Sequence, residues 1–152
     1  MSIWLIGAGQ MAQDYAKVLK ALDVQFEIIG RGVESASIFY SYTGIPVKTG
    51  GVSQVLKAQK APDTAIVAVG VEQLAETTAE LIQSGTKRIL LEKPGGLNIN
   101  ELKLLADIAV KNNANVWLAY NRRFYASTMK AEELINRDGG VSSVQFEFTE
   151  WS

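Results

Sequence analysis

Two spacings of hydrophobic residues alternate along most of the chain. Short apolar runs predict strands at residues 3–6, 26–29, 64–69, 88–91 and 116–119, with a short strand or turn at 45–47. Between these runs, apolar residues at helical spacing predict helices at 11–22, 33–42, 52–59, 74–84, 98–109 and 127–136. The run at 64–69 (TAIVAV) is apolar on both faces, which is typical of a central parallel strand covered by helices.

The helix at 98–109 carries a start signal of its own. Asn98 with Glu101 three residues later resembles a capping box, in which both side chains bond to free backbone N–H groups. The apolar positions after it predict the buried face of that helix: Leu102, Leu105, Ala106 and Ala109.

Strands that alternate with helices predict an α/β fold with a doubly wound parallel sheet over residues 1–137. The last stretch has a different pattern, because apolar and polar residues alternate one by one in Val144–Trp151, after the turn signal Asp138–Gly140. We therefore expect residues 138–152 to begin a second, antiparallel-sheet domain. The apolar face of this strand also suggests an assembly role, with homo-oligomerisation through it.

Composition narrows the possible chemistry. The 152 residues carry a net charge of −1 and contain no Cys and no His, which excludes thiol nucleophiles, disulfides, Cys/His zinc sites and histidine acid–base catalysis in this chain, and we expect no metal site. The sequence shows no basic patch of the kind that would indicate a nucleic-acid partner. Its longest apolar runs are far shorter than the roughly 20 residues of a membrane span. The first residues lack the basic region of a signal peptide, so a cytoplasmic location is expected.

A glycine motif follows the first predicted strand. Residues 7–12 read G-x-G-x-x-A and open a helix, which is the context in which this pattern binds a dinucleotide. Gly7 permits a tight turn, Gly9 lets the backbone approach a pyrophosphate, and Ala12 allows the helix to pack closely on the strand. The motif predicts a Rossmann domain that binds NAD or NADP; a glycine-rich turn without a ligand is the alternative.

The end of the second predicted strand bears on the choice of dinucleotide. NAD enzymes place a carboxylate there to bind the ribose 2′-OH, whereas this chain has Gly30 and Arg31, and Glu27 lies inside the strand. A planar guanidinium after a small residue suits a 2′-phosphate, so we expect NADP in preference to NAD. In the alternative interpretation, Arg31 is a solvated loop residue and the site does not discriminate.

Lys93 lies in the segment E-K-P-G-G that follows the strand at 88–91. Ligands of doubly wound folds bind at the carboxyl ends of the strands, so Lys93 is the candidate catalytic residue, as proton donor or as polariser of a carbonyl. A surface lysine in a turn is the alternative.

With these motifs in this order, and with Arg123 and Phe124 after the sixth strand, the chain resembles the Gfo/Idh/MocA oxidoreductases through about residue 150. The resemblance implies hydride transfer between NAD(P) and a sugar, cyclitol or sugar-nucleotide alcohol or carbonyl. By position, it places the following residues at the coenzyme: Gly7, Gly9, Gln10, Met11, Gly30, Arg31, Val69, Gly70, Val71, Glu92 and Lys93. It places Tyr120, Asn121 and Arg123 toward a sugar-like substrate.

The chain also departs from the family pattern. Residues 70–74 (GVEQL) lack the Pro-Asn and His usual after the fourth strand, and the family's catalytic His belongs to a C-terminal domain that would lie beyond residue 152. A coenzyme-binding domain of an oxidoreductase is the first hypothesis. The alternative is a non-catalytic dinucleotide-binding sensor or regulatory module.

Overall fold

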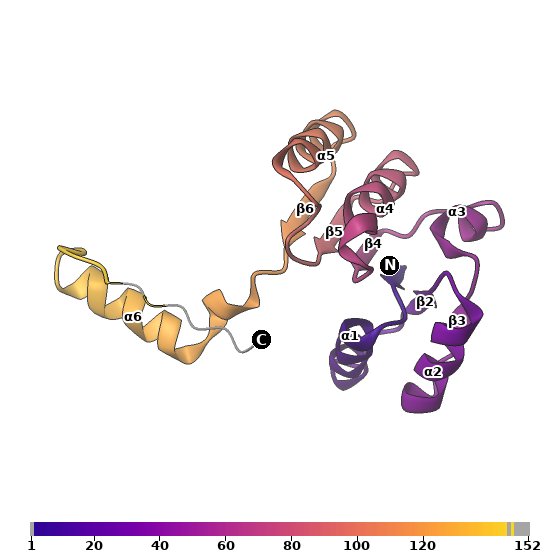
Figure 1. The fold of residues 1–152 in the computed structure, drawn as a ribbon, viewed down its shortest axis with the longest axis horizontal. Coiled ribbons are helices and arrows are strands. Elements are labelled where there is room, and N and C mark those ends of the chain that lie inside the picture. The colour runs from indigo at the N-terminus through magenta and orange to yellow at the C-terminus, as the bar shows by residue number, and fades with distance from the viewer. Residues whose placement is uncertain (1, 146, 148–152) are drawn as a thin grey trace. The chain divides into compact units, whose positions relative to one another are not determined.

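The computed structural model describes residues 2–145 and 147. Contacts between residues divide the chain into two units, Met1–Ala119 and Tyr120–Ser152 (Figure 1). The first unit contains the sheet and the helices that cover it. Among its described residues, the second contains one 3-10 turn and one helix.

The first unit is built on a single sheet of six parallel strands. Its spatial order is β3-β2-β1-β4-β5-β6, in which the direction of winding reverses between β1 and β4. This confirms the predicted doubly wound α/β fold. The strands are β1 (Ile3–Ile6), β2 (Glu27–Ile29), β3 (Val47–Lys48), β4 (Thr64–Val67), β5 (Arg88–Leu91) and β6 (Asn115–Leu118).

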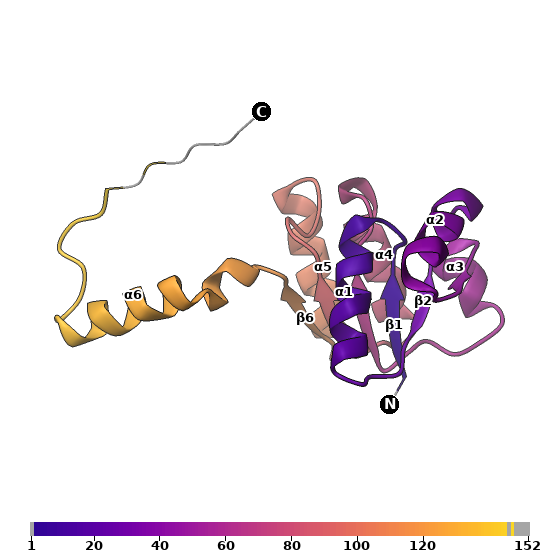
Figure 2. The ribbon, with the colours of Figure 1, turned by 90° about the horizontal axis from the view of Figure 1, so that it is seen from below.

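Helices cover both faces of the sheet, as Figures 1 and 2 show. The helices are α1 (Gln10–Ala21), α2 (Val33–Thr43), α3 (Gly51–Leu56), α4 (Val71–Gln83) and α5 (Ile99–Lys111). On one face α1 and α2 pack around Leu5, Ile28 and Phe39, and on the other α3, α4 and α5 pack around Trp4 and Val67. Because the central strands are buried from both sides, their side chains form one apolar run, which explains the TAIVAV pattern.

The link between β4 and α4 differs from the prediction. The strand ends at Val67 instead of residue 69, and the helix begins at Val71 instead of residue 74. Gly70 occupies the N-cap position, and Glu72 places a carboxylate in the first turn, where the helix dipole favours negative charge. Residues 68–70 are thereby left as a loop at the carboxyl end of the sheet.

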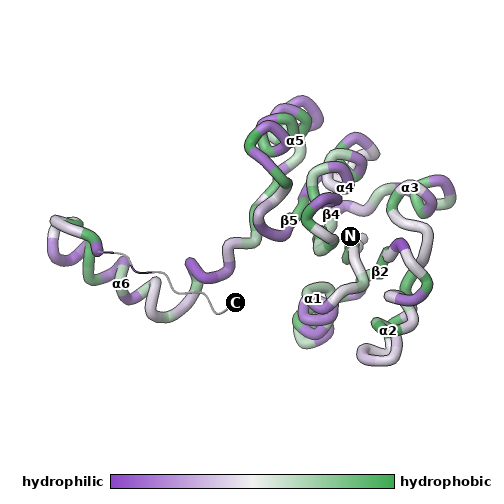
Figure 3. The backbone as a smooth tube through the Cα atoms, in the orientation of Figure 1, coloured by the Kyte–Doolittle hydropathy of each residue, from purple (hydrophilic) through white to green (hydrophobic). Residues whose placement is uncertain are grey.

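The start of α5 confirms the capping prediction. The Asn98 side chain accepts hydrogen bonds from the backbone N–H groups of Asn100 (3.0 Å) and Glu101 (3.1 Å). Leu105 and Ala109 are buried as predicted, but Leu102 is half-buried and Ala106 is exposed. Ala106 lines an apolar hollow beside β6, which is an edge strand of the sheet. Figure 3 shows hydrophobic and hydrophilic residues along α1, α4 and α5, as expected of helices with one face in the core.

The second unit contains η1 (Asn121–Phe124) and α6 (Ala126–Arg137), close to the helix predicted at 127–136. The expected strand at Val144–Trp151 lies mostly outside the described residues, and residues 144, 145 and 147 are not part of a strand. The contact division at Ala119 precedes the expected domain boundary at residue 137, which stays a prediction. Within the described part of the chain, no helix has the length and apolarity needed to cross a membrane.

The Asn98 cap gives a direct test of this fold. We expect Asn98→Ala to lower the free energy of unfolding by about 1 kcal/mol, because two N–H groups at the start of α5 lose their acceptor. Chemical denaturation measures the change. Asn100→Ala, two residues on, is the matched control and should have little effect; equal losses for both variants would contradict the capping role.

Candidate functional site

The glycine loop joins β1 to α1 at the carboxyl end of the sheet. Gly7 has φ +123°, and a Cβ on Gly7 would lie 2.2 Å from the carbonyl oxygen of Ala68. Its N–H donates to the carbonyl of Ile29 at 2.8 Å. Gly7 therefore lies in close contact with the ends of β2 and β4, where only glycine has room.

The space around Gly9 is open, whereas the space around Gly7 is crowded. It is the N-cap residue of α1, is exposed, and has no heavy atom within 4 Å of a Cβ built on it. Ala12, one turn into α1, is fully buried against the apolar cluster around Leu5. The first turn of α1 thus lies tightly on the sheet while its free N–H groups face open space, which is the arrangement that binds a pyrophosphate.

A hollow of about 480 Å³ lies at this edge of the sheet. It brings together the glycine loop, the segment after β2 and the loop after β4. Its lining residues are Gly7, Ala8, Gly9, Gln10, Met11, Arg31, Gly32, Ser35, Ala68, Val69, Gly70 and Gln73. The structure thus gathers in one cleft most of the predicted coenzyme residues, from three separate segments of the chain.

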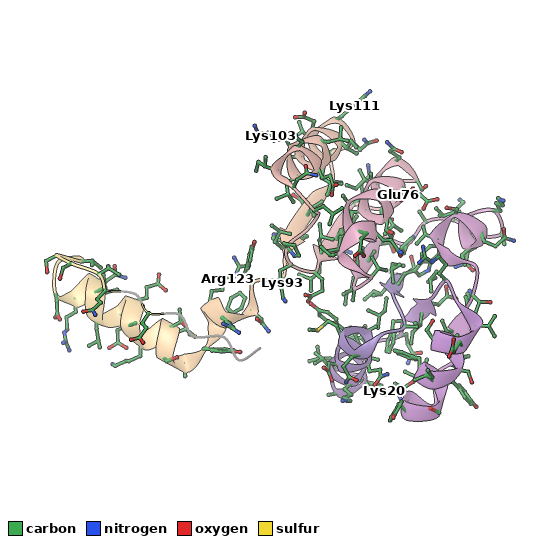
Figure 4. All side chains as sticks on the ribbon, in the orientation of Figure 1. Lys20, Glu76, Lys93, Lys103, Lys111 and Arg123 are labelled. Carbon is green, nitrogen blue, oxygen red and sulfur yellow. The ribbon has the colours of Figure 1, made fainter. Side chains whose placement is uncertain are left out.

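A smaller pocket of about 190 Å³ adjoins this cleft and shares four residues with it: Gly7, Arg31, Val69 and Gln73. Gly30 lines this second pocket, together with the start of α3 and one side of α4. Glu76, Thr77 and Glu80 contribute the side of α4, and Figure 4 shows Glu76 on that helix.

Arg31 and Gln73 meet where the two hollows adjoin. With the Gln73 amide turned so that its oxygen faces the guanidinium, that oxygen accepts from Arg31 Nη1 at 2.8 Å and from Nη2 at 2.6 Å. Arg31 is exposed and Gln73 half-buried. The contact joins the loop after β2 to the first turn of α4.

Glu27 has partners of its own at the start of β2. Its carboxylate accepts from Lys48 Nζ at 2.7 Å and from the Gln59 amide at 2.8 Å. Both hydrogen bonds lower the pKa of Glu27, and the one from Lys48 has the larger effect. The end of β2 offers no other carboxylate, because the residues that follow Ile29 are Gly30, Arg31 and Gly32.

Glu92, in the E-K-P segment after β5, is buried and lines neither hollow. Its Oε1 accepts a hydrogen bond of 2.6 Å from the phenol of Tyr15, which projects from α1. Burial of the phenol, and next the neighbouring Glu92 carboxylate, raise the pKa of Tyr15 well above its ordinary value. The bond joins the glycine-loop helix to the E-K-P segment, with the Tyr15 phenol as the donor.

The remaining predicted site residues lie elsewhere. Lys93 is exposed in the segment after β5 (Figure 4), and Val71 is the first residue of α4; neither lines the two hollows. Tyr120 precedes η1 in the second unit, and η1 carries Asn121 and Arg123, whose guanidinium lies 4.9 Å from the centre of the Phe124 ring. The roles given to these residues stay predictions.

The hollow with the largest volume described here, about 760 Å³, lies between α1 and α2. It meets the cleft at Ala8, Gly9, Gln10 and Ser35. Lys17 and Lys20 lie along it, but Lys17 pairs with Asp14 and Lys20 donates to the Thr43 carbonyl. Both hollows reach the N-terminus of α1, but of the two it is the cleft of about 480 Å³ that also contains Arg31, so this cleft is the better candidate for an anionic ligand.

Comparison with known families decides the assignment. A family profile described as "Oxidoreductase family, NAD-binding Rossmann fold", that of Gfo/Idh/MocA, matches residues 1–120. The chain belongs to the Gfo/Idh/MocA family. A comparison with curated proteins gave no match.

Solved structures share the fold at low sequence identity. GenD2 from gentamicin A biosynthesis, in complex with NAD, has a TM-score of 0.79 and 21% identity over 94% of this chain and 41% of its own. WlbA dehydrogenase from Chromobacterium violaceum, with NADH and UDP-GlcNAcA, has a TM-score of 0.77 and 16% identity over 91% and 40%. Biliverdin reductase from Synechocystis sp. PCC 6803, with biliverdin and NADP+, has a TM-score of 0.73 and 18% identity over 89% and 42%. The chain thus spans about two fifths of the length of these structures.

The sequence did not assign a role in the site to several cleft residues of this Gfo/Idh/MocA chain. Gln73 and Ser35 line the cleft, and Glu76 and Glu80 line the adjoining pocket. Ser35 and Gln73 lie in the first turns of helices that follow a strand, and Glu76 and Glu80 lie further along α4. A search of the first turns after each predicted strand would have found Ser35 and Gln73, but the spacing within α4 gave no signal for Glu76 or Glu80.

The crowding at Gly7 leads to a stability prediction. We expect Gly7→Ala to lower the free energy of unfolding by at least about 2 kcal/mol, because the methyl group meets a backbone carbonyl at a positive φ. Gly9→Ala has open space around its Cβ and should cost less, at most about 1 kcal/mol through the weaker N-cap. Thermal unfolding of both variants measures the difference, and equal stability would show that the β1–β4 contact is not tight.

The Tyr15–Glu92 bond leads to a pH prediction. We expect the Tyr15 phenol to ionise only above its ordinary pKa of 10.0, because burial and the adjacent carboxylate disfavour the phenolate. Since the folded chain holds this proton more tightly than the unfolded chain, the stabilisation is complete below pH 10.0 and is lost as pH rises through the raised pKa.

Alkaline titration of phenolate absorbance tests this expectation. Tyr15→Phe should delete the late absorbance change, whereas Tyr40→Phe, at a position 56% exposed on α2, should retain it. Loss of the late change in the Tyr40 variant alone would contradict the assignment.

Proposed function

We propose that this chain is the coenzyme-binding domain of an oxidoreductase that transfers hydride between a nicotinamide coenzyme and a sugar-like alcohol or carbonyl, and that it prefers NADP. The observation that carries the proposal is the cleft of about 480 Å³ in which the open N-terminus of α1 and Arg31 lie together. The non-catalytic alternative is less favoured, because the matching family is one of oxidoreductases.

The residues of the cleft suit the parts of a dinucleotide. Gly9, Gln10 and Met11 would hold the pyrophosphate through the free N–H groups at the start of α1, where no side chain of the cap competes for them. Gly30, Arg31 and Gly32 would bind the adenosine ribose at the end of β2. The adjoining pocket of about 190 Å³ would take the adenine, with Val69 on one side.

The preference for NADP follows from charge at the ribose position. Arg31 is a cation at the point where NAD enzymes have a carboxylate. Glu27 does not serve as that carboxylate, because Lys48 and Gln59 already bind it at the start of β2. A 2′-phosphate would neutralise Arg31, whereas the 2′-OH of NAD would leave its charge unmatched.

The chemical step is proposed from the family and from Lys93. The bound coenzyme supplies the hydride or accepts it. Lys93 would move the proton of the substrate alcohol or polarise its carbonyl, since a chain without His offers lysine as its cationic acid. Val71 and Glu92 would support the nicotinamide end, Glu92 through its bond to Tyr15.

The substrate class rests on comparison. WlbA dehydrogenase was crystallised with UDP-GlcNAcA, and the family resemblance points to sugars, cyclitols and sugar nucleotides. Tyr120, Asn121 and Arg123 are the residues of this chain proposed to face such a substrate. Self-association through residues 144–151 and a cytoplasmic location stay predictions from the sequence.

Titration with NADPH and NADH tests the proposal. We expect the wild-type chain to bind NADPH more tightly, and Arg31→Ala to weaken NADPH by roughly tenfold or more while leaving NADH almost unchanged, because only the 2′-phosphate loses a charged partner. Calorimetry measures both affinities.

Gly9→Ala is the contrasting variant. It should weaken both coenzymes alike, because its methyl group fills the space needed by the pyrophosphate they share. Failure of the wild-type chain to bind either coenzyme at millimolar concentration would refute the proposed function. Tighter binding of NADH would refute the preference for NADP alone.

A further inference from the structure

We infer that Gln73 is a specificity-determining positioning residue: it holds the Arg31 guanidinium with one edge free for a 2′-phosphate and does so through a neutral amide. This inference rests on the proposed function. It concerns a residue in the first turn of α4, outside the glycine motif and outside the segment after β2.

The geometry of the contact decides which donors stay free. The single oxygen of the Gln73 amide lies within hydrogen-bonding distance of both Nη1 and Nη2, so it occupies the end of the guanidinium. A guanidinium carries five N–H donors, and this contact uses one from each terminal nitrogen. The Nε–H and the neighbouring terminal N–H remain together on one side, and this pair forms the two-pronged donor that matches a phosphate.

The backbone around each of the two residues is fixed independently. The carbonyl of Arg31 accepts from the Gly50 N–H at 3.2 Å, and the carbonyl of Gly30 accepts from the Gly51 N–H at 2.9 Å, which joins this loop to the start of α3. Gln73 donates its own N–H to the Gly70 carbonyl at 2.9 Å in the first turn of α4. The side-chain bond therefore connects two anchored segments, and it limits the rotamers of a long, exposed arginine.

The place of the pair fits this role. Arg31 and Gln73 each line both the cleft of about 480 Å³ and the pocket of about 190 Å³. The proposed binding mode puts the adenosine ribose at this junction, between pyrophosphate and adenine. An arginine held here from α4 meets the 2′ position already ordered, so the phosphate does not bear the entropic cost of ordering it.

The neutrality of the amide is the second part of the inference. A carboxylate at position 73 would bind the same two nitrogens as an ion pair and would neutralise Arg31 before any coenzyme arrived. Glutamine makes the hydrogen bonds without the charge. Gln73→Glu is therefore the informative variant, and Glu is well suited to the third position of a helix, so this variant is expected to fold.

The experiment measures NADPH and NADH affinities by calorimetry for the wild-type chain, Gln73→Ala and Gln73→Glu. We expect the ratio of NADPH to NADH affinity to fall roughly 3- to 10-fold in Gln73→Ala, through lost ordering of Arg31, and roughly tenfold or more in Gln73→Glu. Gln83→Glu is the matched control, because it adds the same charge to an exposed position at the far end of α4 and should leave the ratio unchanged.

The same substitutions in an Arg31→Ala background separate positioning from a general effect on the helix. Without Arg31, Gln73→Ala should no longer change the ratio, whereas damage to α4 would lower both affinities in either background. An unchanged ratio in Gln73→Ala and Gln73→Glu, while the wild-type chain prefers NADPH, would overturn the inference and leave the proposed function intact. If the wild-type chain binds neither coenzyme, both fall together.

Discussion

The close approach of Gly7 to the end of β4 is the constraint on which the rest of the cleft depends. A side chain at this position would meet the Ala68 carbonyl, and the same residue donates its N–H to the end of β2. The chain thus turns at the reversal point of the sheet without moving away from it. Because of this turn, α1 begins directly above the strand ends, and the open Gly9 follows two residues later.

The charged side chains near this turn come from neighbouring elements and not from the turn itself. Arg31 reaches the cleft from β2, while Glu27 on the same strand is bound by Lys48 and Gln59. Gln73 meets Arg31 from α4, and Tyr15 on α1 meets Glu92 after β5. The Arg31–Gln73 and Tyr15–Glu92 contacts each link two elements at the carboxyl end of the sheet, so the cleft depends on packing and on a few polar bonds.

The sequence predicts the parts of this arrangement that depend on local pattern. The bounds of β1 and β5, the glycine turn, the Asn98 cap and the cation at Arg31 all follow from short-range spacing and turn chemistry. The end of β4 was predicted two residues late, because apolar residues continue to Val69 although the ladder stops at Val67. The spacing of apolar residues does not indicate where a strand stops pairing with its neighbours.

Contacts between residues that are distant in the chain could not be predicted from the sequence. Tyr15 and Glu92 are 77 positions apart, and the side-chain bond between Arg31 and Gln73 exists because β2 and α4 flank the same cleft. These contacts depend on the strand order, which the alternation of elements does not specify by itself. Gln73 had no motif to mark it, whereas Arg31 stood at a position with a known role in dinucleotide binding.

The most direct test of the central claim is a titration of the isotopically labelled chain with NADPH, followed by backbone amide resonances. The account predicts that the largest shifts lie at residues 7–11, 30–32 and 69–73, the segments that line the two adjoining hollows. Shifts confined to residues 13–20 and 38–45, which line the hollow between α1 and α2 outside the cleft, or no saturable shifts at all, would contradict it.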